Sequence, residues 1–428
     1  MVKGYLTLIF LLVSLFSRAA SILIPMDEAQ KNHLKSYGIA YWTLKKGVAV
    51  DWLLNYRGGS FLIKYAQPIE NECRIRGITY EVITDGQVNA ILTEIASPEV
   101  NMEMVKLETA AKIAVYSPNN VFTTKDYTDA VQLALEYAEI PYDIIYDEEV
   151  LNGVLPKYEW LHLHHEDFTG QFGLSGQRQS QEDINIQKSI ANRHGYPKVS
   201  QMKLTVAKNI SKFISGGGYL FAMCSAGETL DVALAAEGID IVESNHDGDG
   251  SDPRAQSKLD FSKTLAFSNF ILKPDYRGFS NINAGRYANP ENDFFTLFSY
   301  SAKWDLVPSM LTQDHEFVIK GFNGQTTAFN ESTVKSNVLV MGETKVAGVA
   351  RYIHGELGNG QWTYYGGHDP EGDFGRGGGG GFRGNGVRLP NNPADRKRDL
   401  SLTPNSPGYR LILNNVLFPS AKKKKQKT

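Results

Sequence analysis

One cysteine occupies the position best suited to covalent chemistry. Residues 219–223 (Tyr-Leu-Phe-Ala-Met) predict a buried strand, and residues 229–236 predict a helix. Cys224 lies between them, with the small residues Ala222 and Ala226 two positions before and after it. A nucleophile flanked by small residues between a strand and a helix is the nucleophile-elbow pattern. The helix N-terminus would favour thiolate over thiol, so the pattern predicts a reactive cysteine.

A histidine-rich segment follows a different predicted strand. On a strand, His162 and His164 would share one face and His165 would take the other. These side chains could bind zinc, with His246 as a further ligand, and the reaction would then be metal-assisted hydrolysis with His368 as another ligand. The alternative is that the imidazoles pack in the sheet while Glu166 and the next residue cap a loop, with no metal and no cofactor.

These segments must be positioned by a sheet. From residue 112 onward strands alternate with helices. The predicted strands are 112–116, 142–146, 160–165, 219–223, 338–341, 346–354 and 361–365, and the predicted helices are 126–139, 201–214, 229–236 and 407–417. The alternation predicts a doubly wound, mostly parallel α/β sheet of flavodoxin-like type. Ligands bind beyond the carboxyl ends of such strands, so we expect Asn119, His164, His165 and Glu166 to contact substrate.

The chain divides into several predicted parts. Residues 1–20 have a lysine, an apolar core and a small-residue cleavage site, which predicts a cleaved signal peptide and a periplasmic or secreted protein. A small α+β domain spans 21–110. The main α/β domain spans 111–420, with insertions near 169–200, 243–296 and 372–405, and a basic tail spans 421–428. The tail is expected to be solvated, with weak membrane-surface contact as the alternative.

Composition narrows the functional classes. The 428 residues are 42% hydrophobic and 21% charged, as in a globular protein, and the net charge of -3 argues against general binding to nucleic acid. The remaining partners are a small molecule, a glycan or a peptide. Two cysteines are present, so a disulfide between Cys73 and Cys224 is the structural alternative to a reactive thiol.

Two motifs resemble a known superfamily. The segment Ala222-Met223-Cys224-Ser225-Ala226 resembles the Gly-x-Cys-x-Gly elbow of the class I glutamine amidotransferase-like superfamily, which includes ThuA-like proteins. A later segment, His368-Asp369-Pro370-Glu371, resembles its His-Pro-Glu motif with one inserted residue.

The resemblance implies roles for individual residues. Cys224 would be the nucleophile, His368 the base, and Glu371 or its rival Asp369 the group that orients the imidazole. The N–H of Ser225, with another N–H near Asn119, would hold the oxyanion. Both elbow glycines of the superfamily are alanines here. Two hypotheses follow: a cysteine-dependent amide or acyl hydrolase, or a non-catalytic protein that binds a ligand such as a glycan.

The mature chain also resembles a family of exported Bacteroidota proteins usually labelled asparagine synthetase B. The resemblance rests mainly on residues 24–27, 52–61, 162–171 and 406–410. Synthetase activity itself is not expected. Position two is Val2, where such enzymes carry their cysteine, and Ser215-Gly216-Gly217 does not continue into their pyrophosphate loop and precedes a strand.

Overall fold

The structure is a computed structural model of the chain. It describes residues 19–117, 129–173, 179–272, 278–284, 294–305, 307–312, 316–320, 328–367, 370 and 399–421. Several predicted features lie outside these residues: the signal peptide up to residue 18, Asn119, His368, Asp369, Glu371 and the lysines of the tail. In the described part of the chain, no helix is both long enough and apolar enough to span a membrane.

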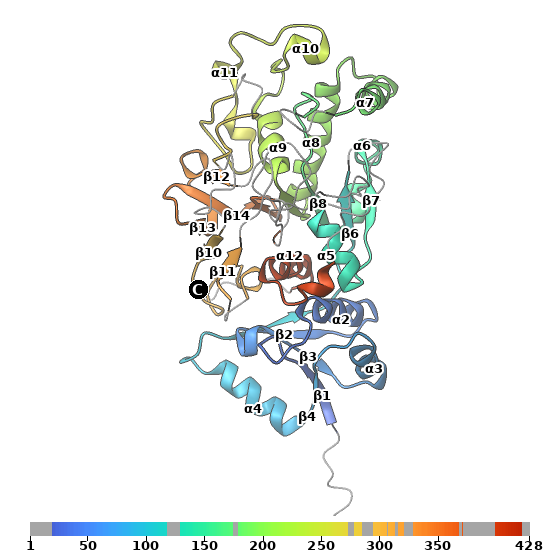
Figure 1. The fold of residues 1–428 in the computed structure, drawn as a ribbon, viewed down its shortest axis with the longest axis vertical. Helices are drawn as coiled ribbons and strands as arrows, with labels where there is room; N and C mark the ends of the chain where they lie inside the picture. Colours follow the sequence, from blue (N-terminus) through green and yellow to red (C-terminus); the bar gives the residue numbers. More distant parts are fainter. Residues whose placement is uncertain are drawn as a thin grey trace, which may run out of the picture. The chain divides into compact units, whose positions relative to one another are not determined.

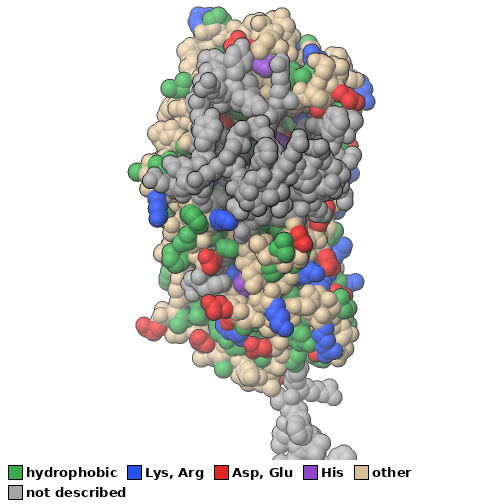
Figure 2. All heavy atoms as spheres, viewed as in Figure 1, with side chains coloured by type: hydrophobic (Ala, Val, Ile, Leu, Met, Phe, Trp, Pro, Cys, Tyr) green, Lys and Arg blue, Asp and Glu red, His purple; other side chains and the backbone are tan. Residues whose placement is uncertain are grey.

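The chain folds as two compact units. Unit 1 contains residues 1–110, 300–315 and 420–428, and unit 2 contains residues 111–299 and 316–419. Each unit has its own sheet. On the face shown in Figure 2, the described side chains of both charge signs are interspersed, in keeping with 44 basic and 47 acidic residues in the sequence.

Residues 300–315 belong to unit 1, whereas the sequence analysis placed them in the second domain. Two asparagines of unit 1 hold this segment. The Asn101 side chain donates to the Tyr300 carbonyl (2.8 Å) and accepts from the Ala302 N–H (2.7 Å). The Tyr300 hydroxyl donates to the Asn55 side chain. These contacts join positions about two hundred residues apart, so local sequence patterns do not contain them.

Unit 1 is an antiparallel sheet with helices on both faces (Figure 1). The strand order is β4-β1-β3-β2-β5, with β1 Ala19–Ile24, β2 Val50–Leu54, β3 Ser60–Lys64, β4 Glu81–Thr84 and β5 Glu103–Leu107. Its helices are α2 His33–Lys45, α3 Gln67–Ile75 and α4 Asp85–Ala96. Alternate residues face opposite layers: Leu53 and Leu62 pack with Ile91 of α4, whereas Trp52 and Tyr37 of α2 contact each other edge to face.

Unit 2 is a mixed α/β structure around a ten-stranded sheet. The strand order is β11-β10-β13-β14-β15-β9-β8-β6-β7, with β12 beside β14. The strands are β6 Ile113–Tyr116, β7 Asp143–Ile145, β8 Trp160–Leu163, β9 Tyr219–Met223, β10 Phe294–Leu297, β11 Val318–Lys320, β12 Phe329–Asn330, β13 Leu339–Thr344, β14 Val349–Leu357 and β15 Gly360–Tyr365. Strands β7, β6, β8, β9 and β15 run parallel, and the remaining pairs are antiparallel.

The prediction of a mostly parallel sheet therefore describes only half of it. Strands β14 and β15 are joined by two residues, Gly358 and Asn359, which permits only an antiparallel hairpin. Gly358 has φ of 60°, a value that suits a tight turn. Strand β15 then pairs in parallel with β9, so it joins the two halves of the sheet.

Helices cover both faces of the parallel half (Figure 1). Helices α8 (Val199–Ser215) and α9 (Ser225–Ala235) pack together on one face, and α5 (Ala130–Ala138) and α12 (Pro407–Leu417) pack together on the other. The shorter elements α6 Asp147–Leu151, α10 Ser244–Asp247 and α11 Ala255–Lys258 lie in the connections. Leu161 and Leu220 belong to the core with α8, whereas the Trp160 indole donates to the Asn415 side chain of α12 (2.9 Å).

The predicted insertions contain order that composition did not predict. Within 169–200, helix α7 spans Gln181–Arg193 and starts with a capping box between Ser180 and Asp183. Within 243–296, the chain is held by α9. The Asp231 carboxylate accepts the backbone N–H groups of three successive residues from Leu265 at 2.8–2.9 Å. Hydrogen bonds from the backbone of this segment to a buried carboxylate thus order a segment for which the sequence shows no helix or strand pattern.

Gly360 provides a test of how β15 is positioned. A Cβ at Gly360 would lie 2.0 Å from the Ile214 carbonyl oxygen and 2.3 Å from that of Gly218, both backbone atoms. We expect Gly360→Ala to lower the free energy of unfolding by about 2 kcal/mol or more, because the backbone must shift. Gly250→Ala, where a Cβ meets nothing within 4 Å, is the control. Urea unfolding curves that coincide for the two variants would contradict this packing.

Candidate active site

Cys224 is the hinge between a strand and a helix, and its backbone is strained. It follows β9 directly, it is the residue before the first turn of α9, and it has φ of 53° and ψ of −131°. L-residues rarely adopt such angles, at a cost of about 1–3 kcal/mol. The N–H of Cys224 donates to the Tyr365 carbonyl of β15 (3.2 Å), and the side chain is buried. Sheet pairing therefore holds the cysteine in the elbow conformation.

The neighbours of Cys224 are small because the elbow is crowded. Ala222 and Ala226 are buried, so alanine fits where the superfamily has glycine. The tightest approach is one residue further on. A Cβ at Gly227 would lie 2.8 Å from the ring of Tyr364, so a glycine is needed there for α9 to pack on β15.

The loop after β8 lies against the first turns of α9. The Ser225 hydroxyl donates to the His165 carbonyl (3.1 Å), and the Thr229 hydroxyl donates to the Glu166 carbonyl (2.6 Å). This agrees with the parallel pairing of β8 and β9. The structure therefore brings His165, Glu166 and Ser225 to the carboxyl edge of the sheet, next to Cys224.

A buried carboxylate, Asp129, organises the histidines. It caps α5 by accepting the N–H groups of the two residues that follow Ala130, at 2.8 and 3.2 Å. His162 Nε2 lies 3.2 Å from its Oδ1, and His164 Nδ1 lies 4.0 Å from its Oδ2. The other ring nitrogen of His162 lies 3.0 Å from the Phe221 carbonyl. His162 is thus held inside the sheet, and the edge-to-face contact of His164 and His165 (4.2 Å between ring centroids) continues the cluster outward.

The sequence analysis missed Asp129. Its helix was predicted from residue 126, although it starts at Ala130. The available signal was an aspartate immediately before the apolar run of the helix, which is a typical N-cap. Nothing local indicates that this cap also contacts the β8 histidines.

Glu166 is a buried acid beside this cluster. Its side chain is 5% exposed, and its Oε2 accepts no hydrogen bond from the described residues. Burial raises the pKa of Glu166 to about 8, and the nearby His164 opposes this only in part. The carboxyl group is therefore mainly protonated at neutral pH.

The neighbouring acid, Asp167, has a different role. It accepts from the Thr169 N–H (2.8 Å) and the Gly173 N–H (2.9 Å), which closes the loop after β8. Loop closure uses both of its carboxylate oxygens.

On the other side of Cys224 is the chain that leaves β15. Gly366 and Gly367 follow this strand, which ends at Tyr365, and Gly367 has φ of 110°. Pro370 is buried, and a Cβ at Gly408 of α12 would lie 2.3 Å from its Cβ. The side chains predicted for the triad, those of His368, Asp369 and Glu371, lie outside the described residues, so their geometry toward Cys224 is not part of this structure.

Within the described residues, the proposed zinc ligands His162, His164 and His246 do not form a group that could share a cation. His246 lies in α10, within the 243–296 insertion, and His162 lies inside the sheet. Among the described residues, the group whose ligand atoms are close enough to share a cation is Asp240, Asp247 and Asp249. The Lys198 ammonium already lies 2.5–3.0 Å from all three carboxylates. It supplies the positive charge that this acidic cluster requires.

Cys73 and Cys224 are not joined by a disulfide in the structure, which differs from the alternative raised from the sequence. Cys73 is buried in α3, and burial raises its pKa to about 12. It is therefore a poor nucleophile, in contrast to a cysteine at a helix N-terminus.

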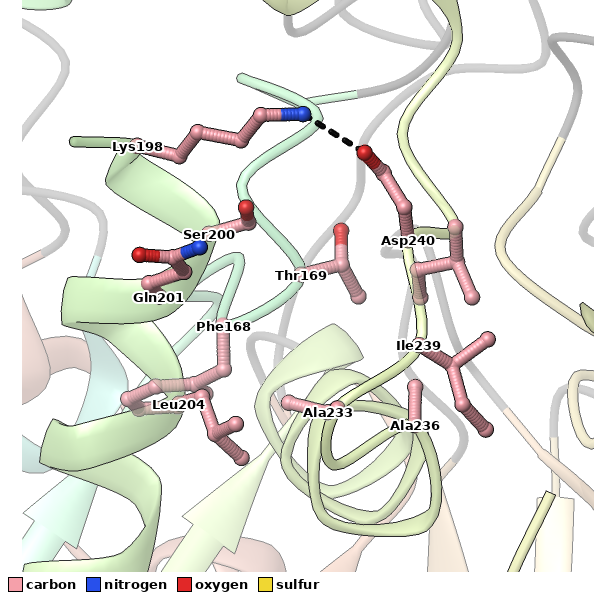
Figure 3. Close-up of a pocket in the computed structure, with 12 residues that line it drawn as sticks. Phe168, Thr169, Lys198, Ser200, Gln201, Leu204, Ala233, Ala236, Ile239 and Asp240 are labelled. Atoms are coloured by element: carbon pink, nitrogen blue, oxygen red, sulfur yellow. Dashed lines mark hydrogen bonds and ion pairs between the residues drawn. The ribbon is translucent and has the colours of Figure 1, made fainter. Parts of the chain in front are cut away.

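A cavity of about 230 Å³ lies between α8, α9 and the loop after β8 (Figure 3). Its wall combines neutral polar side chains with an apolar floor: Thr169, Ser200 and Gln201 on one part, and Phe168, Leu204, Ala233, Ala236 and Ile239 on the other. In Figure 3, the Lys198–Asp240 ion pair crosses above these residues. Cys224 does not line the cavity, but the loop after β8 reaches both.

Comparisons with known proteins do not identify a family for this chain. No family model and no curated protein matches the chain. A solved cytoplasmic protein from Salmonella typhimurium is 10% identical with a TM-score of 0.33, over 61% of this chain and 90% of that one. A GH42 β-galactosidase from G. stearothermophilus is 13% identical with a TM-score of 0.27, over 61% of this chain and 28% of its own length. An exo-β-1,4-mannosidase from an Opitutaceae bacterium is 11% identical with a TM-score of 0.25, over 59% and 30%.

The chain thus spans less than a third of the length of the two glycosidases. All three TM-scores are below 0.5, so these likenesses establish neither a shared fold nor a shared activity.

Strain at the elbow makes a prediction about stability. Glycine tolerates the Cys224 backbone and alanine does not, so Cys224→Gly should be about 1 kcal/mol more stable than Cys224→Ala. Within a helix, alanine is more favourable than glycine, so Ala226→Gly in α9 should be destabilising by a similar amount. Denaturant unfolding of the three variants measures both differences. A less stable Cys224→Gly would mean that the observed φ carries no strain.

The raised pKa of Glu166 predicts that the stability of the folded protein depends on pH. Its pKa in the folded protein exceeds the value of about 4.3 expected for an unfolded chain, so the folded state binds more protons between these values. The free energy of unfolding should therefore fall as pH rises from about 4.5 to 8, by up to roughly 1.4 kcal/mol per pH unit from this group. Glu166→Gln should lose this contribution, whereas Glu182→Gln on the exposed side of α7 should retain it. Urea titrations at pH 5 to 8 measure the slopes, and parallel curves for wild type and Glu166→Gln would contradict the assignment.

Proposed function

We propose that this protein is a hydrolase of amides or esters that uses Cys224 as its nucleophile. The single observation that carries the proposal is the backbone of Cys224, with φ of 53° between a buried strand and an eleven-residue helix. A non-glycine residue persists in this conformation only where the surrounding structure holds it there, and such residues are concentrated at active sites. At an elbow, the conformation presents the nucleophile at the edge of the sheet.

The strand order supports a finer placement of unit 2. In chain order the parallel strands are β6, β7, β8, β9 and β15, and across the sheet they lie in the order β7-β6-β8-β9-β15. This is the order 2-1-3-4-5 of flavodoxin-like sheets. This supports the proposal that unit 2 has a class I glutamine amidotransferase-like sheet. The antiparallel strands β14, β13, β10 and β11 then extend that sheet on one side.

The groups around Cys224 suit acyl transfer. The N-terminus of α9 favours the thiolate, and the first N–H groups of a helix have no partner within it. The Ser225 N–H is thus a donor for the oxyanion, with the second donor proposed near Asn119. As the resemblance implies, His368 is assigned as the base and Glu371 or Asp369 as its orienting group. His165 is a rival base because its backbone is hydrogen-bonded to Ser225 beside the elbow.

Alkylation of the cysteines by iodoacetamide tests this function. Cys224 should react with an apparent pKa below the value of about 8.5 of a free cysteine, and Cys73→Ala should react in the same way. His368→Ala and His165→Ala identify the base, because loss of an imidazolium partner raises the apparent pKa of the thiol. A protein that is alkylated at Cys224 only after unfolding would contradict a working nucleophile.

Ligand binding without catalysis is the second candidate, and the cavity beside α8 is the observation that favours it. Its mixed lining suits a small neutral molecule with several hydroxyl groups, such as a sugar unit of a glycan. On this proposal, Cys224→Ser leaves ligand affinity unchanged while a hydrolase would lose turnover. Export through the predicted signal peptide is part of both proposals.

A further inference from the structure

Glu166 is a buried acid whose carboxyl group is incompletely hydrogen-bonded by the described residues. Its Oε2 is buried and receives no hydrogen bond from the described residues. An ionised carboxylate in such surroundings loses its hydration, and His164, Lys203 and a backbone N–H compensate for this loss only in part, so the group remains protonated until well above pH 5. A protonated carboxyl group is a donor, and Glu166 is thus a proton donor that the described structure does not use.

The charged groups around Glu166 are already paired with one another. Lys203 of α8 donates to both carboxylate oxygens of Asp147 (2.8 and 2.9 Å), and the Tyr116 hydroxyl donates to the same carboxylate (2.5 Å). The Asp129 carboxylate is occupied by the first turn of α5 and by His162. His164 is the remaining titratable neighbour. Among the described residues, Lys203 and His164 favour the ionised form of Glu166 only in part, because burial has the larger effect on its pKa.

The position of Glu166 favours a role in the reaction over a purely structural one. Glu166 follows β8. From β6 the chain continues to β7 on one side of β6 and then to β8 on the other side, so β6 and β8 are the adjacent strands at which the strand order reverses. Ligands of open α/β sheets bind in the crevice beyond such a pair of strands. The Thr229 hydroxyl donates to the backbone carbonyl of Glu166, which holds the loop after β8 against α9 one turn after the elbow. The loop that carries the acid therefore lies where this crevice meets the nucleophile.

We propose that Glu166 supplies the proton that the leaving group needs, and that the substrate is therefore an amide. This inference rests on the proposed function. The Cys224 thiolate attacks the amide carbonyl, the C–N bond breaks, and Glu166 gives its proton to the departing amine. The products of this step are a thioester, a free amine and the Glu166 carboxylate. Water then attacks the thioester while that carboxylate takes the proton of the water. The second step releases the carboxylic acid and restores the thiolate and the protonated Glu166.

Leaving groups of different basicity test the proposal. An anilide leaving group must be protonated, whereas p-nitrophenolate leaves without a proton. On matched p-nitroanilides and p-nitrophenyl esters of small acyl groups, including glutamyl, Glu166→Gln should lower kcat/KM for the anilide about 100-fold and change the ester less than about 3-fold. Wild-type anilide hydrolysis should fall above pH 8, and ester hydrolysis should not.

Controls separate the possible outcomes. Cys224→Ala should abolish hydrolysis of both substrates, and Glu228→Gln, a buried acid of α9 that accepts from Ser280, should affect both substrates alike. Equal losses for anilide and ester in Glu166→Gln would overturn the role of Glu166 and leave the nucleophile intact. A wild type that hydrolyses neither substrate overturns the proposed function and this role with it.

A spectroscopic measurement does not depend on turnover. The infrared carbonyl band of a protonated carboxyl group should be present at pH 7, absent in Glu166→Gln, and lost in the wild type as pH rises through about 8. Absence of the band at pH 7 would overturn the proposal even if the variants hydrolyse poorly. If Glu166→Gln does not fold, Glu166→Asp provides the same comparison of anilide with ester.

Discussion

The parallel pairing of β9 with β8 on one side and β15 on the other is the interaction on which the site depends. These hydrogen bonds fix the last residues of β9, so the chain must turn into α9 at a single residue. Cys224 accepts the resulting backbone strain because its own N–H is bound to Tyr365 of β15. Without the strand on each side, the turn would relax and the cysteine would not be held at the edge of the sheet.

Helix α9 also holds the connecting segments around it in place. Its first turns hold the loop after β8 through Ser225 and Thr229. Its buried acids, Glu228 and Asp231, hold the long insertion through Ser280 and through backbone N–H groups. A carboxylate that accepts several backbone N–H groups orders irregular chain by satisfying donors that no helix or strand pairs. One helix thus positions the nucleophile, the histidine-rich loop and an insertion.

Buried charge in unit 2 is distributed unequally. The set Tyr116, Asp147 and Lys203 is satisfied within itself, and Asp129 is satisfied by a helix N-terminus and a histidine. Such complete pairing is what structural polar groups require in a low dielectric. One oxygen of Glu166, Oε2, departs from this rule, and Glu166 belongs to the loop that contacts α9 beside the elbow. The contrast between these paired sets and the unbonded oxygen of Glu166 is the reason to treat Glu166 as functional.

The sequence by itself determined the elements whose signals are local. The apolar run 219–223 and the helix 407–417 coincide with β9 and α12, because side-chain periodicity and flanking glycine or proline encode them directly. It also singled out Cys224 and the residues after β8. Only the tertiary structure decided that 300–315 joins unit 1, that Asp129 contacts the histidines, and that β10 pairs with β13. These features depend on contacts between distant segments, which leave no periodic trace in a single chain.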